Sequence, residues 1–391
     1  MPRKAWGLLH TLDASRNPST WKTARFWADG TLAVLQLPEA TDGALRFERW
    51  NKKTGALKET HTVNFITEEG LLLVLSNDQS LTAEVSDRIV TLRETRTGQP
   101  IHVFRCRGLS SYRDTTISEP IWVCFSEDNR RMLSVAVEGT ARVWDIETGD
   151  MLADVPCYKY LQSRVVFSPD AKYLLLTMKD GPAILLDATT GTQLHKFEGS
   201  SEEEHFQYWV VSHANFSPDG SLVSTLGRVG AARLWDTSTG TLLHQFNEIC
   251  VPGDNIQSFS PDGRLFATTN FEGCVYLWNT TTGELHHALE GHERYIYNIV
   301  FSPDGTMVAT ASSDHTIMLW NAETGERCTV LFDCSDAGSE IQFSPDGRFL
   351  VSRGIWDCKL RLWGEVESAG PEEMPYEFEP FFWQEWKYRM R

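Results

Sequence analysis

A Thr-Gly dipeptide recurs along this 391-residue chain at intervals of 42 to 51 residues. Its glycines are Gly55, Gly98, Gly149, Gly191, Gly240, Gly283 and Gly325. Five positions earlier stands a second series, which consists of Trp50, Arg93, Trp144, Leu186, Trp235, Trp278 and Trp320, and Trp363 continues it one interval further on. A fixed offset kept over so many copies is typical of a repeat architecture, in which each copy forms the same supersecondary unit. The chain therefore contains eight copies of one unit.

A second motif marks a tight turn in most copies. Phe-Ser-Pro-Asp-Gly begins at Phe216, Phe259, Phe301 and Phe343, and close variants begin at Phe125 and Phe167. Proline presets the first central φ of a β-turn, aspartate hydrogen bonds to nearby backbone, and glycine tolerates the conformation that follows. The flanking segments, such as 307–311 and 316–320, are short and rich in β-favouring residues. Each copy therefore predicts four short strands, with a hairpin at this motif.

Two copies near the N-terminus depart from these motifs and are aligned by their spacing. We align the first on residues 26–30, which leaves an insertion at residues 39–43. We align the second on residues 75–79, because an alignment on Phe65 would make the preceding connection too short and the hairpin too long.

A four-stranded unit with Trp-Asp or a near-equivalent at the end of its third strand resembles the repeat of the WD-repeat β-propeller family, over roughly residues 5 to 364. The copies are also similar in style to the propeller arrays of NACHT-type NTPases, although no phosphate-binding Gly-x-x-x-x-Gly-Lys-Ser/Thr loop is present. The resemblance implies an all-β fold with a single propeller of eight four-stranded blades. Seven blades plus an extra hairpin is the alternative.

The resemblance also implies a division of the chain. Residues 1–13 would form a strand that completes the last blade and closes the ring, and residues 14–364 would form the propeller. Residues 365–391 differ in kind, because an acidic, proline-bearing stretch is followed by one dense in aromatic residues. We expect this C-terminal tail to dock on the propeller, with a recognition peptide that folds on binding as the alternative.

In the seventh copy, the resemblance places a structural tetrad that consists of His292, Ser312, Asp314 and Trp320. In the family these residues form a hydrogen-bonded relay from His to Asp to a Ser or Thr hydroxyl, and on to the indole N–H. Such a relay satisfies buried polar groups. We therefore expect a structural role for the tetrad and predict no catalytic residue.

The charge balance argues against nucleic acid and membrane partners. Lys and Arg total 36 against 53 Asp and Glu, which gives a net charge of −17, and this charge repels phosphate backbones and anionic membrane surfaces. No segment has the roughly 20 apolar residues of a membrane-spanning helix, and the N-terminus lacks the apolar region of a signal peptide. We expect a cytoplasmic protein, with the nucleus left open as the alternative.

Metal-binding and cofactor-binding patterns are missing from the sequence. The eight cysteines include no Cys-x-x-Cys pair, which argues against a zinc site and against a disulfide framework. The turn aspartates occur once per copy, too far apart for paired acid–base chemistry and without the ligand spacing of a calcium loop. We expect neither a metal nor a cofactor.

Departures from the repeat point to one face of the propeller. The connections 98–125 and 191–216 are long, and in the family such fourth-to-first-strand connections share a face with the second-to-third-strand turns. Family offsets and the second connection give candidate partner-binding residues: Phe206, Tyr208, Trp209, Arg228, Phe271, Tyr295, Tyr297 and Trp356. Exposed aromatic residues anchor protein interfaces. Packing of an individual ring into a blade core is the alternative.

These features favour a non-catalytic scaffold, monomeric outside its complex, that binds a protein or peptide partner through this face. The first alternative is an enzyme, because Glu119, Glu138, Asp180, Glu272 or His61 could converge at the mouth of the central channel. The second alternative is a ligand-sensing module that acts beside a partner carrying the output domain.

Overall fold

The computed structural model of the chain describes most of the repeat copies. The described residues are 5–12, 21–26, 32–36, 44–50, 53, 57–64, 72–76, 78, 80–86, 89–105, 120–136, 140–156, 165–177, 181–198, 211–227, 231–246, 257–332, 340–353 and 360–366. They form strands and turns, with no helix among them. The all-β prediction is therefore confirmed for this part of the chain.

The described strands form eight four-stranded antiparallel sheets, which we number in chain order. Sheet 1 contains β2 (Trp21–Phe26), β3 (Leu32–Gln36), β4 (Ala44–Trp50) and β5 (Leu57–Asn64). Sheet 2 contains β6 (Leu72–Leu75), β7 (Leu81–Ser86), β8 (Ile89–Glu94) and β9 (Pro100–Arg105). Sheet 3 contains β10 (Pro120–Phe125), β11 (Arg131–Ala136), β12 (Thr140–Asp145) and β13 (Met151–Pro156). Sheet 4 contains β14 (Val165–Phe167), β15 (Tyr173–Thr177), β16 (Ala183–Asp187) and β17 (Gln193–Phe197).

The second half of the chain continues the same pattern. Sheet 5 contains β18 (Val211–Phe216), β19 (Leu222–Gly227), β20 (Ala232–Asp236) and β21 (Leu242–Phe246). Sheet 6 contains β22 (Gln257–Phe259), β23 (Leu265–Thr269), β24 (Val275–Asn279) and β25 (Leu285–Leu289). Sheet 7 contains β26 (Ile296–Phe301), β27 (Met307–Ser312), β28 (Thr316–Asn321) and β29 (Arg327–Phe332). Sheet 8 contains β30 (Glu340–Phe343), β31 (Phe349–Arg353), β32 (Leu360–Val366) and β1 (Ala5–Leu12).

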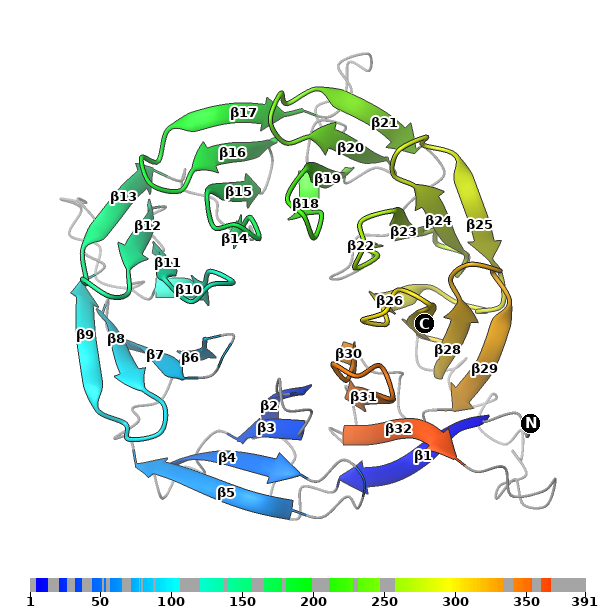
Figure 1. Cartoon of the computed structure of the whole chain (residues 1–391), viewed down its shortest axis with the longest axis horizontal. Helices are drawn as coiled ribbons and strands as arrows, with labels where there is room; N and C mark the ends of the chain where they lie inside the picture. Colours follow the sequence, from blue (N-terminus) through cyan, green and yellow to red (C-terminus); the bar gives the residue numbers. More distant parts are fainter. Residues whose placement is uncertain are drawn as a thin grey trace, which may run out of the picture.

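The sheets stand side by side around a common axis, in chain order (Figure 1). In sheets 1 to 7 the first strand of each copy is innermost and the fourth is outermost (Figure 1). Sheet 8 takes its outer strand from the other end of the chain, because β1 pairs antiparallel with β32 and Leu8 lies opposite Trp363.

The first hairpin of a copy is held by a serine and an aspartate. In sheet 7 the Ser302 hydroxyl donates to Asp304 at 2.6 Å, and Ser302 Oγ accepts the Met307 N–H at 2.9 Å. Gly305 follows with φ 71°, a left-handed conformation that glycine adopts without steric cost. The same serine-to-aspartate bond recurs in sheets 2 to 8. The predicted hairpins are therefore confirmed in these sheets. They include the hairpin of the second copy, which was aligned by its spacing and in which Ser76 bonds to Asp78.

These hairpin carboxylates are held in their charged form. Partial burial alone would raise the pKa of Asp262, but hydrogen bonds from Ser260 and Arg264 outweigh it and lower this pKa to about 2. The pKa values of the equivalent aspartates are also lowered, at Asp78, Asp128, Asp170, Asp219 and Asp304. A carboxylate that accepts several hydrogen bonds binds its proton weakly.

The Thr-Gly turns join the third strand of a sheet to the fourth, and they also contact the preceding sheet. Gly325, with φ 71°, donates its N–H to the Asn321 carbonyl at 3.0 Å. His287, on the outer strand of sheet 6, lies against this turn of sheet 7, with its Nε2 2.8 Å from the Glu323 carbonyl oxygen. A Cβ added at Gly325 would lie 2.8 Å from His287 Cγ. Glycine is therefore required here by backbone conformation and by the neighbouring ring.

This histidine contact recurs between successive sheets. The histidine Nε2 atoms lie within hydrogen-bond distance of a turn carbonyl in three more pairs: His102 with Glu147, His195 with Ser238, and His244 with Thr281. Between sheets 3 and 4, Val155 takes the place of the histidine and would lie 2.9 Å from a Cβ at Gly191. The sequence motif alone gave no indication of these contacts.

The apolar core lies between neighbouring sheets. One cluster joins Leu133 and Val143 of sheet 3 to Leu174 of sheet 4. The tryptophan of a sheet also packs against an outer-strand phenylalanine of the sheet before it, with ring centroids 5.0 Å apart for Phe104 and Trp144, 5.3 Å for Phe197 and Trp235, and 4.5 Å for Phe246 and Trp278. The tryptophans of the repeat are therefore inter-sheet core residues.

Candidate interaction surface around Tyr295

Alternation of strand direction divides the connections between two faces. The serine-aspartate hairpins and the Thr-Gly turns lie on one face. The second-to-third-strand turns and the connections between copies lie on the other, which we call the connection face. In sheets 6 and 7 the structure describes three segments of this face: residues 270–274, 290–295 and 313–315.

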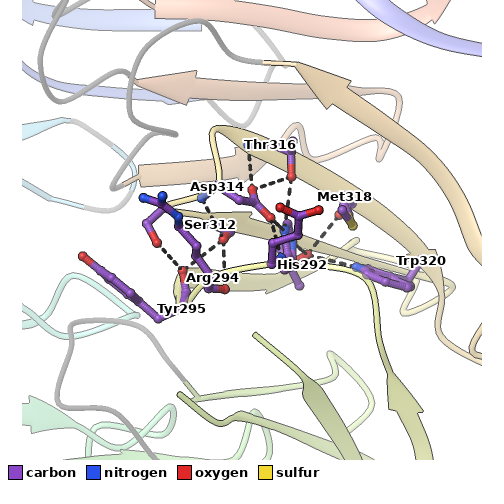
Figure 2. Close-up of polar contacts among 11 residues, drawn as sticks. His292, Arg294, Tyr295, Ser312, Asp314, Thr316, Met318 and Trp320 are labelled. Atoms are coloured by element: carbon purple, nitrogen blue, oxygen red, sulfur yellow. Dashed lines mark hydrogen bonds and ion pairs between the residues drawn. The ribbon is translucent and has the colours of Figure 1, made fainter. Parts of the chain in front are cut away.

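A buried hydrogen-bonded relay lies directly beneath these segments. His292 Nδ1 is 2.8 Å from Asp314 Oδ2 (Figure 2). His292 Nε2 is 2.7 Å from Thr310 Oγ1. The Trp320 indole N–H donates to Thr310 Oγ1 at 2.9 Å. If the His292 Nδ1 proton faces Asp314, the Thr310 hydroxyl donates to Nε2 and accepts from the indole, so every polar group has a partner.

Asp314 is the charged end of the relay. Burial by itself would raise the pKa of Asp314, but hydrogen bonds from His292 and Thr316 and the backbone N–H of Glu293 outweigh it and hold this pKa far below its ordinary value. The Glu293 N–H lies 3.1 Å from Asp314 Oδ2 and the Thr316 N–H 2.9 Å from Asp314 Oδ1. The aspartate therefore fixes both the connection at residue 293 and the turn after β27.

Ser312 is not the hydroxyl of the relay, contrary to the prediction. Its Oγ lies 3.0 Å from the Tyr295 carbonyl oxygen and 3.1 Å from that of Arg294, and it accepts the Asp314 N–H at 3.2 Å (Figure 2). The register explains this result, because Trp320 lies opposite Val308 and the hydroxyl that its indole reaches is two residues further, at Thr310. His292, Asp314 and Trp320 are in the relay as predicted.

The sequence carries a signal for the true relay hydroxyl, which is its spacing from tryptophan. A Ser or Thr accepts the indole N–H in four other sheets, as Ser134 with Trp144, Thr225 with Trp235, Thr268 with Trp278 and Ser352 with Trp363. The hydroxyl stands ten residues before the tryptophan in the first three of these pairs and eleven residues before it in the last.

Two predicted aromatic residues stand above the relay. Tyr295 is 41% exposed and Tyr297 is half-buried. Their hydroxyl oxygens are 2.8 Å apart, and their rings meet edge to face with centroids 4.7 Å apart. The Tyr295 carbonyl accepts the Ser313 N–H at 3.0 Å, in addition to its contact with Ser312. The backbone beneath the exposed ring is therefore fixed by the relay turn.

Phe271 brings a third aromatic ring from sheet 6 and is 64% exposed. Its turn lies against the connection before Tyr295, because a Cβ on Gly273 would lie 2.9 Å from the His292 carbonyl oxygen. This close approach, with φ 84° at Gly273, explains the glycine at this position. We call Phe271, Tyr295 and Tyr297 together the tyrosine surface.

The other predicted partner-binding residues lie outside the described part of the chain. These are Phe206, Tyr208, Trp209, Arg228 and Trp356. The insertion at 39–43, most of both long connections and the tail after residue 366 also lie outside it. Of the residues named for an enzyme, Glu119, Glu138 and Asp180 are not described, whereas Glu272 is exposed beside Phe271.

The described residues contain neither a metal-binding cluster nor a membrane-spanning helix. No group of three or more His, Cys, Asp or Glu side chains among them could hold a metal ion. None of the described segments is a helix of the length and hydropathy needed to cross a membrane. Among the described cysteines, Cys124, Cys274 and Cys328 form no disulfide bond.

Comparisons with known proteins agree with this architecture. The model of the WD domain, G-beta repeat family matches residues 248–279, 283–321 and 329–364. The target of rapamycin complex subunit LST8 of Saccharomyces cerevisiae is 28% identical over 117 residues, a match that covers 30% of this chain and about a third (35%) of the yeast protein. The crystal structure of the computationally designed Ika8 protein is similar in fold, with a TM-score of 0.69 and 21% identity over 92% of this chain and 99% of that one. These matches show WD repeats between residues 248 and 364, and together with the repeated turns and the His292 relay they support a WD-repeat β-propeller family for the chain.

Proposed function

We propose that this chain is a non-catalytic scaffold that binds a protein or peptide partner through its connection face, chiefly at the tyrosine surface. The observation that carries the proposal is the exposure of Phe271 and Tyr295 on one face, because exposed aromatic rings are enriched among the residues that anchor protein interfaces. The hydrogen bonds from Ser312 and Ser313 that fix the backbone at Tyr295 support it, since a rigid anchor loses little conformational entropy on binding.

The relatives support the same class of function. The yeast relative is, by its name, a subunit of a protein complex. We further propose that Phe206, Tyr208, Trp209, Arg228 and Trp356 extend the surface over neighbouring copies, and that the protein is cytoplasmic and monomeric outside its complex.

We also infer that the eight sheets are the blades of one closed ring. The pairing of β1 with β32 supports closure by residues 1–13, because it leaves sheet 8 with the same four strands as every other copy. A closed ring covers the strand edges that would otherwise pair with other chains. It would also hold the connection face rigid for binding.

The test compares polypeptides retained from an extract of the source organism by three immobilised proteins. They are wild type, a Phe271→Ala, Tyr295→Ala, Tyr297→Ala variant, and a Leu285→Ala control. Leu285 is 47% exposed at the start of β25, on the opposite face of sheet 6. Circular dichroism and thermal unfolding establish that all three are folded. We expect a polypeptide that wild type and control retain and the aromatic variant loses. Equal retention by all three would contradict the proposal.

A further inference from the structure

Three glutamates lie on the segments that carry the tyrosine surface. Glu272 follows Phe271 in the turn of sheet 6, and Glu290 and Glu293 lie on the connection that leads to Tyr295. All three side chains are exposed. Among the described residues of these segments, the exposed groups that can carry positive charge are Arg294 and His315. The local balance is therefore acidic, in a chain whose net charge is −17.

Glu272 and Glu290 lie close to the same side chain, that of Cys274. Burial raises the pKa of the Cys274 thiol, and the nearby charges of Glu290 and Glu272 raise it further. The Glu293 N–H is hydrogen bonded to Asp314, and Glu293 stands two residues before Tyr295 in the chain. Asp314 itself already faces His292. The carboxylates open to a partner here are thus those of the three glutamates.

Aromatic rings edged by carboxylates favour a positively charged partner group. The face of a tyrosine or phenylalanine ring attracts ammonium and guanidinium groups. The neighbouring carboxylates add long-range attraction and would repel an acidic segment. A purely apolar partner would leave their charges without a counterpart at the rim.

We propose that the tyrosine surface binds a partner polypeptide segment that carries arginine or lysine, with its cationic side chain over the aromatic rings and within reach of Glu272, Glu290 and Glu293. This inference rests on the proposed function. It adds the charge of the partner to the scaffold role.

The probe is a short, capped, fluorescently labelled peptide that contains two arginines separated by glycine and leucine. The matched control peptide has citrulline in place of both arginines. Citrulline keeps the shape of the side chain and removes its charge. Binding is followed by fluorescence anisotropy at low and moderate salt. The protein variants are Glu272→Gln, Glu290→Gln, Glu293→Gln combined, and Phe271→Ala. The control combines Glu284→Gln, Glu323→Gln and Glu326→Gln, which makes the same charge change on the opposite face of the same two sheets.

We expect citrulline and the combined glutamate variant each to weaken binding about tenfold, and the control less than about twofold. Phe271→Ala should also weaken binding, because it removes one of the aromatic rings that the arginine side chain of the peptide would contact. If the control variant loses as much affinity as the glutamate variant, the peptide is attracted by the overall charge of the protein and not by this surface. If the arginine and citrulline peptides bind equally well, the positive charge of the peptide makes no contribution to binding. Either result, or no binding of the arginine peptide, overturns the inference.

The co-purification experiment separates this inference from the proposed function. If the glutamate variant retains the polypeptide that the aromatic variant loses, the cationic partner is wrong and the scaffold stands. If the aromatic variant also retains it, the proposed function is wrong.

Discussion

The residue at the tryptophan position on the third strand of a sheet depends on the residue that it contacts on the second strand. In five sheets an indole N–H meets a Ser or Thr hydroxyl. In sheet 2 the same two positions hold Arg93 and Glu84, whose Nε and Oε2 atoms lie 2.7 Å apart. In sheet 4 they hold Leu186 and Leu176, both buried. A buried polar group left without its partner is costly, so the two positions differ between copies as a pair.

This pairing predicts a strong coupling between Glu84 and Arg93. Arg93→Leu leaves the carboxylate of Glu84, whose side chain is 10% exposed, without its ion pair, and we expect a loss of about 3 kcal/mol in the free energy of unfolding. Glu84→Leu should cost less, because the Arg93 side chain is 23% exposed and keeps a bond to the Gly98 carbonyl. The double variant recreates the leucine pair of sheet 4 and should recover most of the loss.

The measurement is a double-mutant cycle by urea unfolding, followed by tryptophan fluorescence. Losses that simply add in the double variant would show that the two side chains act independently. The Leu176 and Leu186 pair shows that the fold accepts the apolar solution in another copy.

Among elements, the Thr-Gly turns of sheets 3 to 7 contact the sheet before their own. The turn glycine has a positive φ, and in four pairs of sheets a histidine ring of the preceding outer strand lies over it. The glycine of the first hairpin has a positive φ as well, but Gly305 has only Pro261 Cδ near its missing Cβ, at 3.7 Å. A substitution at Gly305 therefore tests the cost of backbone strain alone, whereas a substitution at Gly325 tests backbone strain together with the contact between sheets.

Gly305→Ala should destabilise the protein by about 1 kcal/mol, the cost of a left-handed alanine. Gly325→Ala should cost more, because its methyl group also meets the His287 ring. In a His287→Ala background, the cost of Gly325→Ala should fall to that of Gly305→Ala. Thermal and urea unfolding of the five proteins measure this, and an unchanged cost without the ring would argue against the contact.

Across the whole molecule, the pairing of β1 with β32 joins the two ends of the repeat array. Removal of residues 1–13 should leave sheet 8 with three strands and uncover the edge of β32. We expect a lower unfolding temperature and concentration-dependent association, measured by calorimetry and by size-exclusion chromatography with light scattering. Removal of residues 367–391 is the control for loss of a terminal segment. A truncated protein as stable and monomeric as wild type would contradict closure by this strand.

Sequence reasoning predicted what is encoded locally and missed what depends on the arrangement of sheets. The hairpin at Asp304 follows from neighbouring residues, so motif chemistry was sufficient. The family resemblance places the relay hydroxyl at Ser312, whereas the cross-strand register from Trp320 places it at Thr310. The contact of His287 with the next sheet requires two copies to be placed together, which no single-copy pattern provides.

The histidine contacts run in one direction around the array. In every described case the ring belongs to the earlier copy and the turn to the later one. In these contacts the earlier copy supplies the histidine N–H and the later copy supplies the turn carbonyl that accepts it. Copies related in this way are interchangeable at their junctions, so a duplicated or deleted unit would rejoin its new neighbours through an existing contact. The geometry of one turn is therefore compatible with growth of such arrays by recombination between repeats.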